Sequence, residues 1–238
     1  MRFSRSVARG IRAALAATLL ASLAAACDNP EPGPVEKDPV IFVHGFVTPA
    51  GLAWDAMIAN FEQNGYSPNE TYRFGYDTTG TSNVQTAKDL ANYVDRILAS
   101  TGASRVDIVS HSMGGINTRY CIKFEGCAGK VDDWVSLAGA NHGTDIAGLC
   151  SIALVTCQEM VPNSPVLQQL NTPPEITSGA RSWTTLWTPG DGIILPATST
   201  IVQGANNIEL PGVLNHLTML GEPTVWNQVR GIVDDGLG

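Results

Sequence analysis

The stretch Val106-Asp107-Ile108-Val109-Ser110-His111-Ser112-Met113-Gly114-Gly115 decides how this chain folds. Its apolar beginning predicts a buried strand, and the apolar spacing of the residues that follow it predicts a helix. Ser112 therefore stands at the apex of a sharp turn, with the small residues Ser110 and Gly114 two positions to either side. Such a turn exposes the serine hydroxyl, and N–H groups at the helix N-terminus favour negative charge beside it. The stretch predicts a nucleophilic serine.

Strand and helix patterns alternate along the rest of the chain. Short apolar runs predict buried strands at 40–43 and 134–137, and further strands are expected at 71–74, 182–187 and 207–210. Apolar residues three and four apart predict helices at 53–64, 87–102 and 223–233, and the helix after the serine turn is expected to end near residue 124. Residues 145–180, which contain four prolines, are expected to be irregular. This alternation predicts an α/β fold, with a mostly parallel central sheet and helices on both faces.

The N-terminal residues carry a targeting pattern. Residues 1–26 combine four arginines with an alanine- and leucine-rich apolar run, which predicts a bacterial secretory signal peptide. Residues 27–38 are rich in proline and predict an extended tether, and residues 39–238 predict a single catalytic domain. Cys27 either follows an ordinary cleavage site or is the lipidated first residue of a lipoprotein. The chain is therefore expected to be exported, with a membrane tether only through a lipidated Cys27.

Charge and cysteine content narrow the choice of partners. The net charge of −8 becomes −12 once the four arginines of residues 1–26 are set aside, which argues against nucleic acid and anionic membranes. Apart from Cys27, the cysteines of an exported chain are expected to pair. Of three possible connectivities, sequence proximity favours Cys121–Cys127 with Cys150–Cys157. Their spacing matches no standard zinc site, so no metal and no cofactor are expected.

Chemistry-bearing residues follow several of the predicted strands. In a parallel sheet, ligands bind at the carboxyl ends of the strands. His44-Gly45-Phe46 follows the first strand, Ser112 follows the central one, and Asp191 and His216 follow the last two. The order serine, aspartate, histidine is that of α/β-hydrolases, in which the aspartate orients the histidine and the histidine activates the serine. Ser112, Asp191 and His216 are the predicted catalytic residues.

Other histidines and aspartates are weaker candidates. His44 and His111 lie beside the first strand and inside the serine turn, where a structural role is expected. His142 precedes Asp191, which breaks the order, so it is expected to be a hydrogen-bonded loop residue. Asp145 is the alternative acid. Two further aspartates, close to the serine helix in sequence, are expected to be solvated: Asp132 and Asp133.

Five segments resemble the small bacterial lipases of the lipase class 2 family. They span about residues 39–235 and read Val-Ile-Phe-Val-His-Gly-Phe (40–46), His-Ser-Met-Gly-Gly (111–115), Val-Asp-Asp-Trp-Val-Ser-Leu-Ala-Gly-Ala-Asn-His-Gly-Thr (131–144), Asp-Gly (191–192) and Asn-His-Leu-Thr-Met-Leu (215–220). Two positions depart from the pattern. Ser110 stands where glycine is usual, and Ala140 stands where proline is expected; neither departure affects a catalytic residue.

The resemblance implies a minimal α/β-hydrolase fold with little or no lid. Carried over by position, it implies Ser112 as nucleophile, Asp191 as acid and His216 as base. The oxyanion would be bound by the backbone N–H groups of Phe46 and Met113. These two apolar residues also suggest an open groove for acyl esters, and the acidic, cysteine-bearing segment around 145–160 could alter access to it.

The implied activity is that of a secreted serine ester hydrolase acting on an acyl ester or lipid. Triacylglycerol lipase is the first expectation, and a short-chain carboxylesterase or a cutinase-like polyester depolymerase are alternatives. An acyltransferase is a further enzyme alternative. A surface-binding lipoprotein that keeps the fold without catalysis is the non-enzyme alternative. No protein partner is implied.

Overall fold

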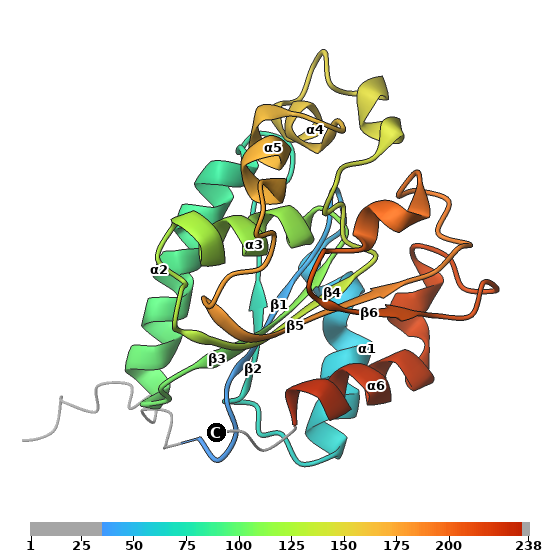
Figure 1. Ribbon diagram of the computed structural model, residues 1–238. Helices are drawn as coiled ribbons and strands as arrows, with labels where there is room; N and C mark the ends of the chain where they lie inside the picture. Colours follow the sequence, from blue (N-terminus) through green and yellow to red (C-terminus); the bar gives the residue numbers. More distant parts are fainter. Residues whose placement is uncertain (1–34, 235–238) are drawn as a thin grey trace, which may run out of the picture. The chain divides into compact units, whose positions relative to one another are not determined.

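A computed structural model describes residues 35–234. The predicted signal peptide, and the tether up to residue 34, lie outside the described residues. Six parallel strands form one sheet in the order β2-β1-β3-β4-β5-β6 (Figure 1). Their bounds are Val40–Val43 for β1, Thr71–Phe74 for β2, Val106–His111 for β3, Val131–Leu137 for β4, Ala180–Trp187 for β5 and Asn206–Glu209 for β6.

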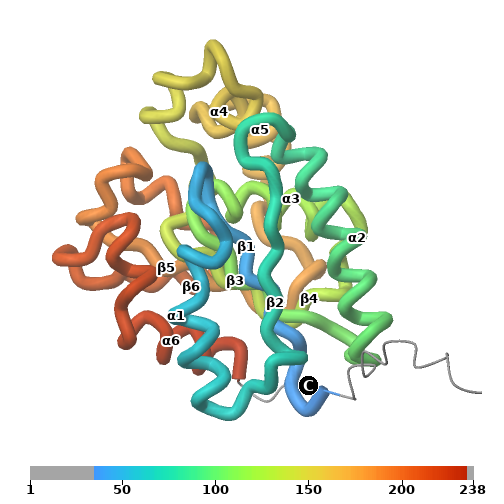
Figure 2. Tube along the Cα trace, turned by 180° about the vertical axis from the view of Figure 1, so that it is seen from behind, coloured from blue at the N-terminus to red at the C-terminus, as the bar shows by residue number. Residues whose placement is uncertain are grey.

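Helices cover both faces of this sheet, as the alternating pattern predicts. The α-helices are α1 (Ala50–Gln63), α2 (Asn83–Thr101), α3 (Gly114–Phe124), α4 (Val155–Met160), α5 (Pro165–Asn171) and α6 (Pro223–Val233). Three short 3₁₀ helices are η1 (Asp145–Leu149), η2 (Ala197–Thr200) and η3 (Thr218–Gly221). Helices α2 and α3 lie on one face and α1 and α6 on the other, an arrangement that Figures 1 and 2 show from opposite sides. The predicted α/β fold, with a parallel central sheet and helices on both faces, is confirmed.

The core is divided by the sheet into two layers. Successive side chains of a strand point to opposite faces, so β1 supplies both layers. Ile41 and Val43 pack with α2 and α3, while Val40 and Phe42 pack with α1 and α6. All four side chains are fully buried, which explains why the run is continuously apolar rather than alternating.

Local signals set the ends of the longest helix, α2. The Ser82 side chain accepts a hydrogen bond from the N–H of Gln85 and so caps the first turn. Gly102 follows the last turn with a φ of 73°, in the left-handed region that glycine adopts without steric cost. The predicted end near residue 102 is therefore correct, and the helix begins at Asn83, a turn earlier than its apolar pattern.

Two expectations for the middle of the chain are wrong. Residues 145–180 are not wholly irregular, because they contain η1, α4 and α5. Helix α5 begins with a recognisable signal: Ser164 caps it by accepting from the N–H of Leu167, and Pro165 occupies its first turn. Strand β4 begins at Val131 rather than at residue 134, so Asp132 and Asp133 belong to the strand.

Both favoured disulfides are present. Cys121–Cys127 joins the last turns of α3 to the segment after it, and Cys150–Cys157 closes the segment between η1 and α4. The pairing predicted from sequence proximity is confirmed. Within residues 35–234, no helix has the length and apolar character needed to span a membrane.

Candidate active site

The candidate residues come together because neighbouring strands end level with one another. Val43 of β1 pairs with Ser110 of β3, and His111 pairs with Leu137 of β4. The segments that leave these strands therefore share the carboxyl edge of the sheet, where an open α/β sheet binds its ligands. Three predicted features lie at this edge. They are the glycine-containing turn after β1, the serine turn, and the loops that carry the predicted acid and base.

The serine turn is a tight elbow between β3 and α3. Ser112 has a φ of 56°, in the left-handed region that side chains other than glycine rarely adopt. Its N–H donates to the carbonyl of Leu137 at 3.1 Å, which ties the elbow to β4. A Cβ at Gly114 would lie 2.7 Å from the carbonyl oxygen of Val43, so only glycine lets α3 begin this close to β1.

Three predicted side chains form a continuous chain of hydrogen bonds. The Ser112 Oγ lies 2.9 Å from His216 Nε2, and His216 Nδ1 lies 3.1 Å from Asp191 Oδ2. Ser112 is 8% exposed, His216 4% and Asp191 3%, so the contacts are shielded from bulk water. With Nδ1–H donating to the carboxylate, Nε2 is left to accept the serine proton.

Asp191 is held as a carboxylate by several donors. Its Oδ1 accepts the N–H groups of Ile193 at 2.9 Å and Ile194 at 2.6 Å. Burial by itself raises the pKa of this carboxyl, but the His216 contact and these two N–H donors outweigh burial and leave the pKa below its ordinary value. The Asp191 carbonyl also accepts the N–H of His216 at 3.0 Å, so the acid loop positions the histidine through its backbone as well.

Two backbone N–H groups beside Ser112 are available to a ligand. Neither the N–H of Phe46 nor that of Met113 donates to another residue in the described part of the chain. Gly45 brings the first of them close, since a Cβ there would lie 2.7 Å from the Ser112 Cβ and 3.2 Å from its Oγ. The Met113 side chain is fully buried in the core, so the expectation that it lines a substrate groove is wrong. Phe46 is half-buried.

A hollow of about 380 Å³ opens next to the turn after β1. It is lined on one side by His44 and residues 47–50, and on the other by residues 75–78 after β2. This places an open space at the same edge of the sheet as the candidate residues.

The remaining histidines have structural contacts, as expected. His44 is buried, donates from Nδ1 to the Gly45 carbonyl at 3.0 Å and stacks on Tyr76 with ring centroids 4.3 Å apart. Burial lowers its pKa. His142 bonds to the Ser199 carbonyl and to Glu175, at 3.2 Å in each case, as predicted for a hydrogen-bonded loop residue.

His111 has a closer relation to the candidate base than its sequence position shows. It is 1% exposed, and its Nε2 donates to the backbone carbonyl of His216 at 2.9 Å. The two rings also contact each other, with centroids 4.5 Å apart. Burial and the neighbouring His216 lower the pKa of His111 to about 3, so its ring is neutral at ordinary pH. No pattern in the sequence reveals this contact, because the carbonyl comes from a residue 105 positions away.

The aspartates set aside in the sequence lie elsewhere. Asp145 is exposed in η1 and has no contact with His216. The expectation that Asp132 and Asp133 are solvated is wrong, since they are 5% and 3% exposed. They are buried because β4 begins early and lies between β3 and β5. Arg181 of β5 bonds to Asp132 at 2.9 Å, and Ser182 donates to Asp133.

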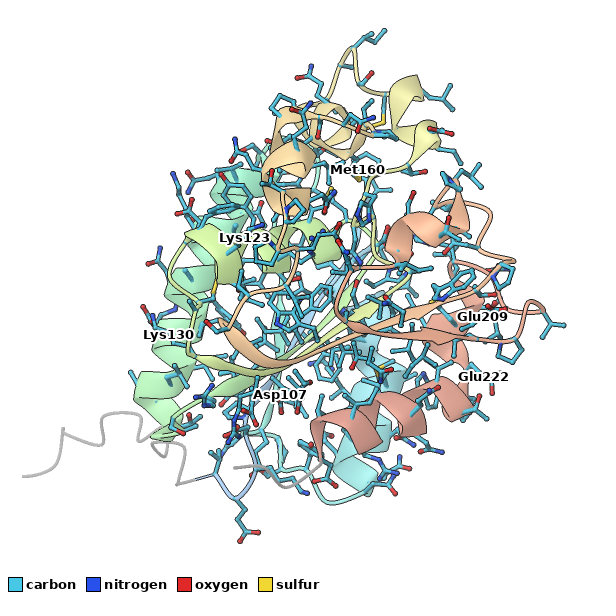
Figure 3. The ribbon with its side chains drawn as sticks, in the orientation of Figure 1. Asp107, Lys123, Lys130, Met160, Glu209 and Glu222 are labelled. Atoms are coloured by element: carbon cyan, nitrogen blue, oxygen red, sulfur yellow. A yellow bond between two sulfur atoms is a disulfide. The ribbon has the colours of Figure 1, made fainter. Side chains whose placement is uncertain are left out.

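One carboxylate cluster lies at the opposite edge of the sheet. Within residues 35–234, Asp38, Asp107 and Asp132 are the set of acidic, histidine or cysteine side chains close enough together to hold a metal ion. Figure 3 labels Asp107 near the lower end of the sheet, whereas Met160, at the end of α4, is labelled toward the other end. The cluster is therefore separate from the Ser112 site.

Comparison with known proteins agrees with this geometry. The Lipase (class 2) family profile matches residues 37–219. A triacylglycerol lipase of Burkholderia plantarii is 31% identical over 129 residues, which cover 49% of this chain and 36% of that protein. A triacylglycerol lipase of Pseudarthrobacter phenanthrenivorans is 31% identical over 87 residues, which cover 34% of this chain and 27% of that one. The matched segments thus span about a third of the length of these curated relatives.

Solved structures share the fold. Lipase B of Aspergillus fumigatus superposes with a TM-score of 0.72 at 21% identity, over 83% of this chain and 52% of that one. The mature lipase BlEst2 of Bacillus licheniformis superposes with a TM-score of 0.67 at 18% identity, over 83% and 95% of the two chains. Because the family profile covers most of the sequence, this chain belongs to the lipase class 2 family.

Proposed function

We propose that this protein hydrolyses acyl esters through Ser112 as nucleophile, His216 as general base and Asp191 as the acid that orients it. One observation carries the proposal: the unbroken hydrogen-bond chain from Asp191 through His216 to the Ser112 hydroxyl, buried at the carboxyl edge of the sheet. The available N–H groups of Phe46 and Met113 beside that hydroxyl support it.

In the proposed mechanism, His216 Nε2 accepts the Ser112 proton as the serine oxygen attacks the ester carbonyl. Asp191 keeps the imidazole in the tautomer with Nδ1–H and stabilises the imidazolium that forms. The N–H groups of Phe46 and Met113 bind the oxyanion of the tetrahedral intermediate, each contributing roughly 10²–10³ in rate. His216 then gives its proton to the departing alcohol. Water, activated by the same histidine, releases the carboxylic acid from Ser112.

Triacylglycerol is the substrate class we favour. Two relatives named triacylglycerol lipase support this choice, each over part of its length. A short-chain carboxylesterase and a cutinase-like polyester depolymerase use the same catalytic residues, so chain-length preference separates them from a lipase. An acyltransferase would pass the acyl group to an alcohol in preference to water.

We also propose that the enzyme is exported. The arginine-rich and apolar pattern of residues 1–26 supports this, and so do the two disulfides, which persist in oxidising compartments. Whether Cys27 is lipidated is read directly from the mass of the mature N-terminus.

A series of p-nitrophenyl esters, with acyl chains from two to sixteen carbons, tests the activity. Activity that rises with chain length and with emulsified substrate supports a lipase, and activity confined to the shortest esters indicates a carboxylesterase. Ser112→Ala removes the nucleophile and is expected to lower kcat at least 10³-fold while the protein stays folded. A folded Ser112→Ala protein with wild-type turnover rules out the assignment. If the folded wild-type protein hydrolyses none of the esters and is not labelled by a serine-reactive phosphonate, the result favours the binding lipoprotein instead.

A further inference from the structure

Exposed apolar side chains gather at the edge of the sheet that holds the candidate active site. Among residues 35–234, nine large apolar side chains are exposed. Eight of them lie on segments that follow the carboxyl ends of strands: Val47, Leu52, Leu149, Ile152, Ile193, Leu195, Val213 and Leu217. The ninth, Phe124, lies at the end of α3 farthest from the serine elbow. Scattered exposed leucines are ordinary, but a gathering around one site indicates a binding surface.

Two of these highly exposed side chains stand three residues apart in the segment 146–158, which we call the apolar tip. Leu149 is 86% exposed and Ile152 is 94% exposed. The segment contains no charged residue, and the Cys150–Cys157 disulfide closes it. In Figures 1 and 2 it lies in the yellow part of the chain at the top of both views, beyond α3.

The base of the apolar tip is fixed to the loop that carries the candidate acid. The Thr144 hydroxyl donates to the carbonyl of Ile193 at 2.6 Å, and the N–H of Asp145 donates to the carbonyl of Leu195 at 3.0 Å. The apolar tip is therefore held beside the Asp191 loop. A surface into which the tip inserts is thereby brought close to the candidate active site.

The charged groups at this edge favour binding to one kind of lipid surface. The segments 44–54, 75–82, 138–179 and 188–222 contain no lysine and no arginine. They do contain carboxylates that face solvent, including Asp77 and Asp145. A surface with negative and apolar groups but no cations is repelled by anionic headgroups and fits a layer without net charge.

We propose that the apolar tip is an interfacial anchor, which inserts Leu149 and Ile152 into the acyl region of a lipid layer without net charge. The inference rests on the proposed ester hydrolysis, because it assigns the apolar tip the task of presenting Ser112 to aggregated substrate. The disulfide keeps the two side chains projecting, so insertion requires no opening of the fold. Leu217, which follows His216 directly and is 60% exposed, is a further apolar side chain for the same layer.

Binding to vesicles of phosphatidylcholine tests this anchor. All proteins carry Ser112→Ala, so that binding is measured without hydrolysis. The double substitution Leu149→Ser with Ile152→Ser removes both inserted side chains, each of which strengthens binding about tenfold or more when fully buried in an apolar phase. The double variant is therefore expected to bind at least tenfold more weakly in co-sedimentation. Phe124→Ser, which removes the exposed apolar side chain far from the site, is the matched control and is expected to bind as the parent does.

Catalysis is measured separately, with Ser112 intact and p-nitrophenyl acetate in true solution. The double variant is expected to keep kcat/KM within about twofold, since neither side chain contacts the catalytic residues, and to lose activity on an emulsified long-chain ester. Unchanged vesicle binding in the double variant, or an equal loss in the Phe124→Ser control, overturns the anchor. A wild-type protein without activity on any ester overturns the proposed function instead, while the vesicle result still decides about the apolar tip.

Discussion

At the residue scale, Gly45 sets how closely the turn after β1 approaches Ser112. A Cβ at this position would lie 2.7 Å from the Ser112 Cβ, a distance that real side chains essentially never show. Gly45→Ala must therefore displace the serine or the N–H of Phe46. We expect kcat on a soluble ester to fall about 10²-fold, the size of losing one oxyanion donor. The melting temperature should stay close to that of the wild type, because the displacement is confined to the site.

Gly75→Ala is the control for this substitution. Gly75 follows β2 at the same edge of the sheet, yet a Cβ there would meet no atom within 4 Å. We expect this variant to keep wild-type kcat. Equal activity of the Gly45 and Gly75 variants would show that the close approach at Gly45 has no catalytic consequence.

His111 is expected to position His216, the proposed general base, without reacting itself. It donates to the His216 carbonyl, and an unsatisfied buried carbonyl costs about 1–3 kcal/mol. His111→Leu should therefore lower kcat by about tenfold or more, and His111→Gln, which keeps an N–H donor, should recover part of the loss. Since the pKa of His111 is about 3, the acid limb of the kcat/KM profile should keep its midpoint in His111→Gln. A shifted midpoint would mean that His111 titrates during turnover.

Residue-level patterns find the three proposed catalytic residues but miss the contact that His111 makes with one of them. The order of Ser112, Asp191 and His216 along the chain, each after a strand, points to the three side chains that the fold brings into contact. A contact from a side chain to a backbone carbonyl leaves no such pattern, because any residue supplies a carbonyl. That is why His111 reads as structural in the sequence.

At the element scale, the amino ends of β3 and β4 and the segment before β1 bring carboxylates together. Asp107 is 2% exposed, and burial raises its pKa well above the ordinary value, with the carboxylates of Asp133, Asp38 and Asp132 adding to the effect. Because the folded pKa is raised, the group contributes its full stability below the unfolded pKa of about 3.9. This contribution is lost as the pH rises through the folded pKa.

Asp107→Asn should therefore stabilise the protein as the pH rises. The amide oxygen keeps the hydrogen bond from the N–H of Asp133 and removes the buried charge. The melting temperatures of wild type and variant should be close near pH 4, and the variant should melt higher at pH 8; each 1 kcal/mol corresponds to about 2–4 °C for a chain of this size. Asp145→Asn, at an exposed site, is the control. A gap between wild type and Asp107→Asn that does not widen with pH contradicts the buried charge.

Apolar runs predicted β1 and β3 because these central strands are buried on both faces, and a strand buried on both faces needs no polar position. The same rule misplaced the start of β4. Asp132 and Asp133 look like loop residues until Arg181 and Ser182 of the neighbouring strand supply their partners. Helices α4 and α5, of six and seven residues, are too short for periodicity to detect. The Ser164-Pro165 pair is a sequence signal for α5, and α4 has no comparable signal.

At the scale of the whole molecule, charge is divided between the two edges of the sheet. The cations Arg105, Lys130 and Arg181 lie at or before the amino ends of strands, whereas the segments 44–54, 75–82, 138–179 and 188–222, beside the carboxyl ends, carry none. Composition alone showed the net charge of −8 but not this division, which appears only when the fold sorts the segments by edge. The face that holds Ser112 is therefore expected to repel anionic surfaces more strongly than the net charge alone suggests.

Replacing part of the phosphatidylcholine by phosphatidylglycerol should therefore weaken vesicle binding of the Ser112→Ala protein. Raising the salt from about 0.1 M to 1 M shortens the Debye length from about 10 Å to 3 Å and should restore most of the loss. With phosphatidylcholine alone, the same change of salt should leave binding nearly unaltered, because insertion of Leu149 and Ile152 involves no charge. Co-sedimentation at both salt concentrations measures all four cases. Stronger binding to phosphatidylglycerol would mean that the lipid meets one of the cationic segments near the amino edge, and that the edge bearing Ser112 faces away from it.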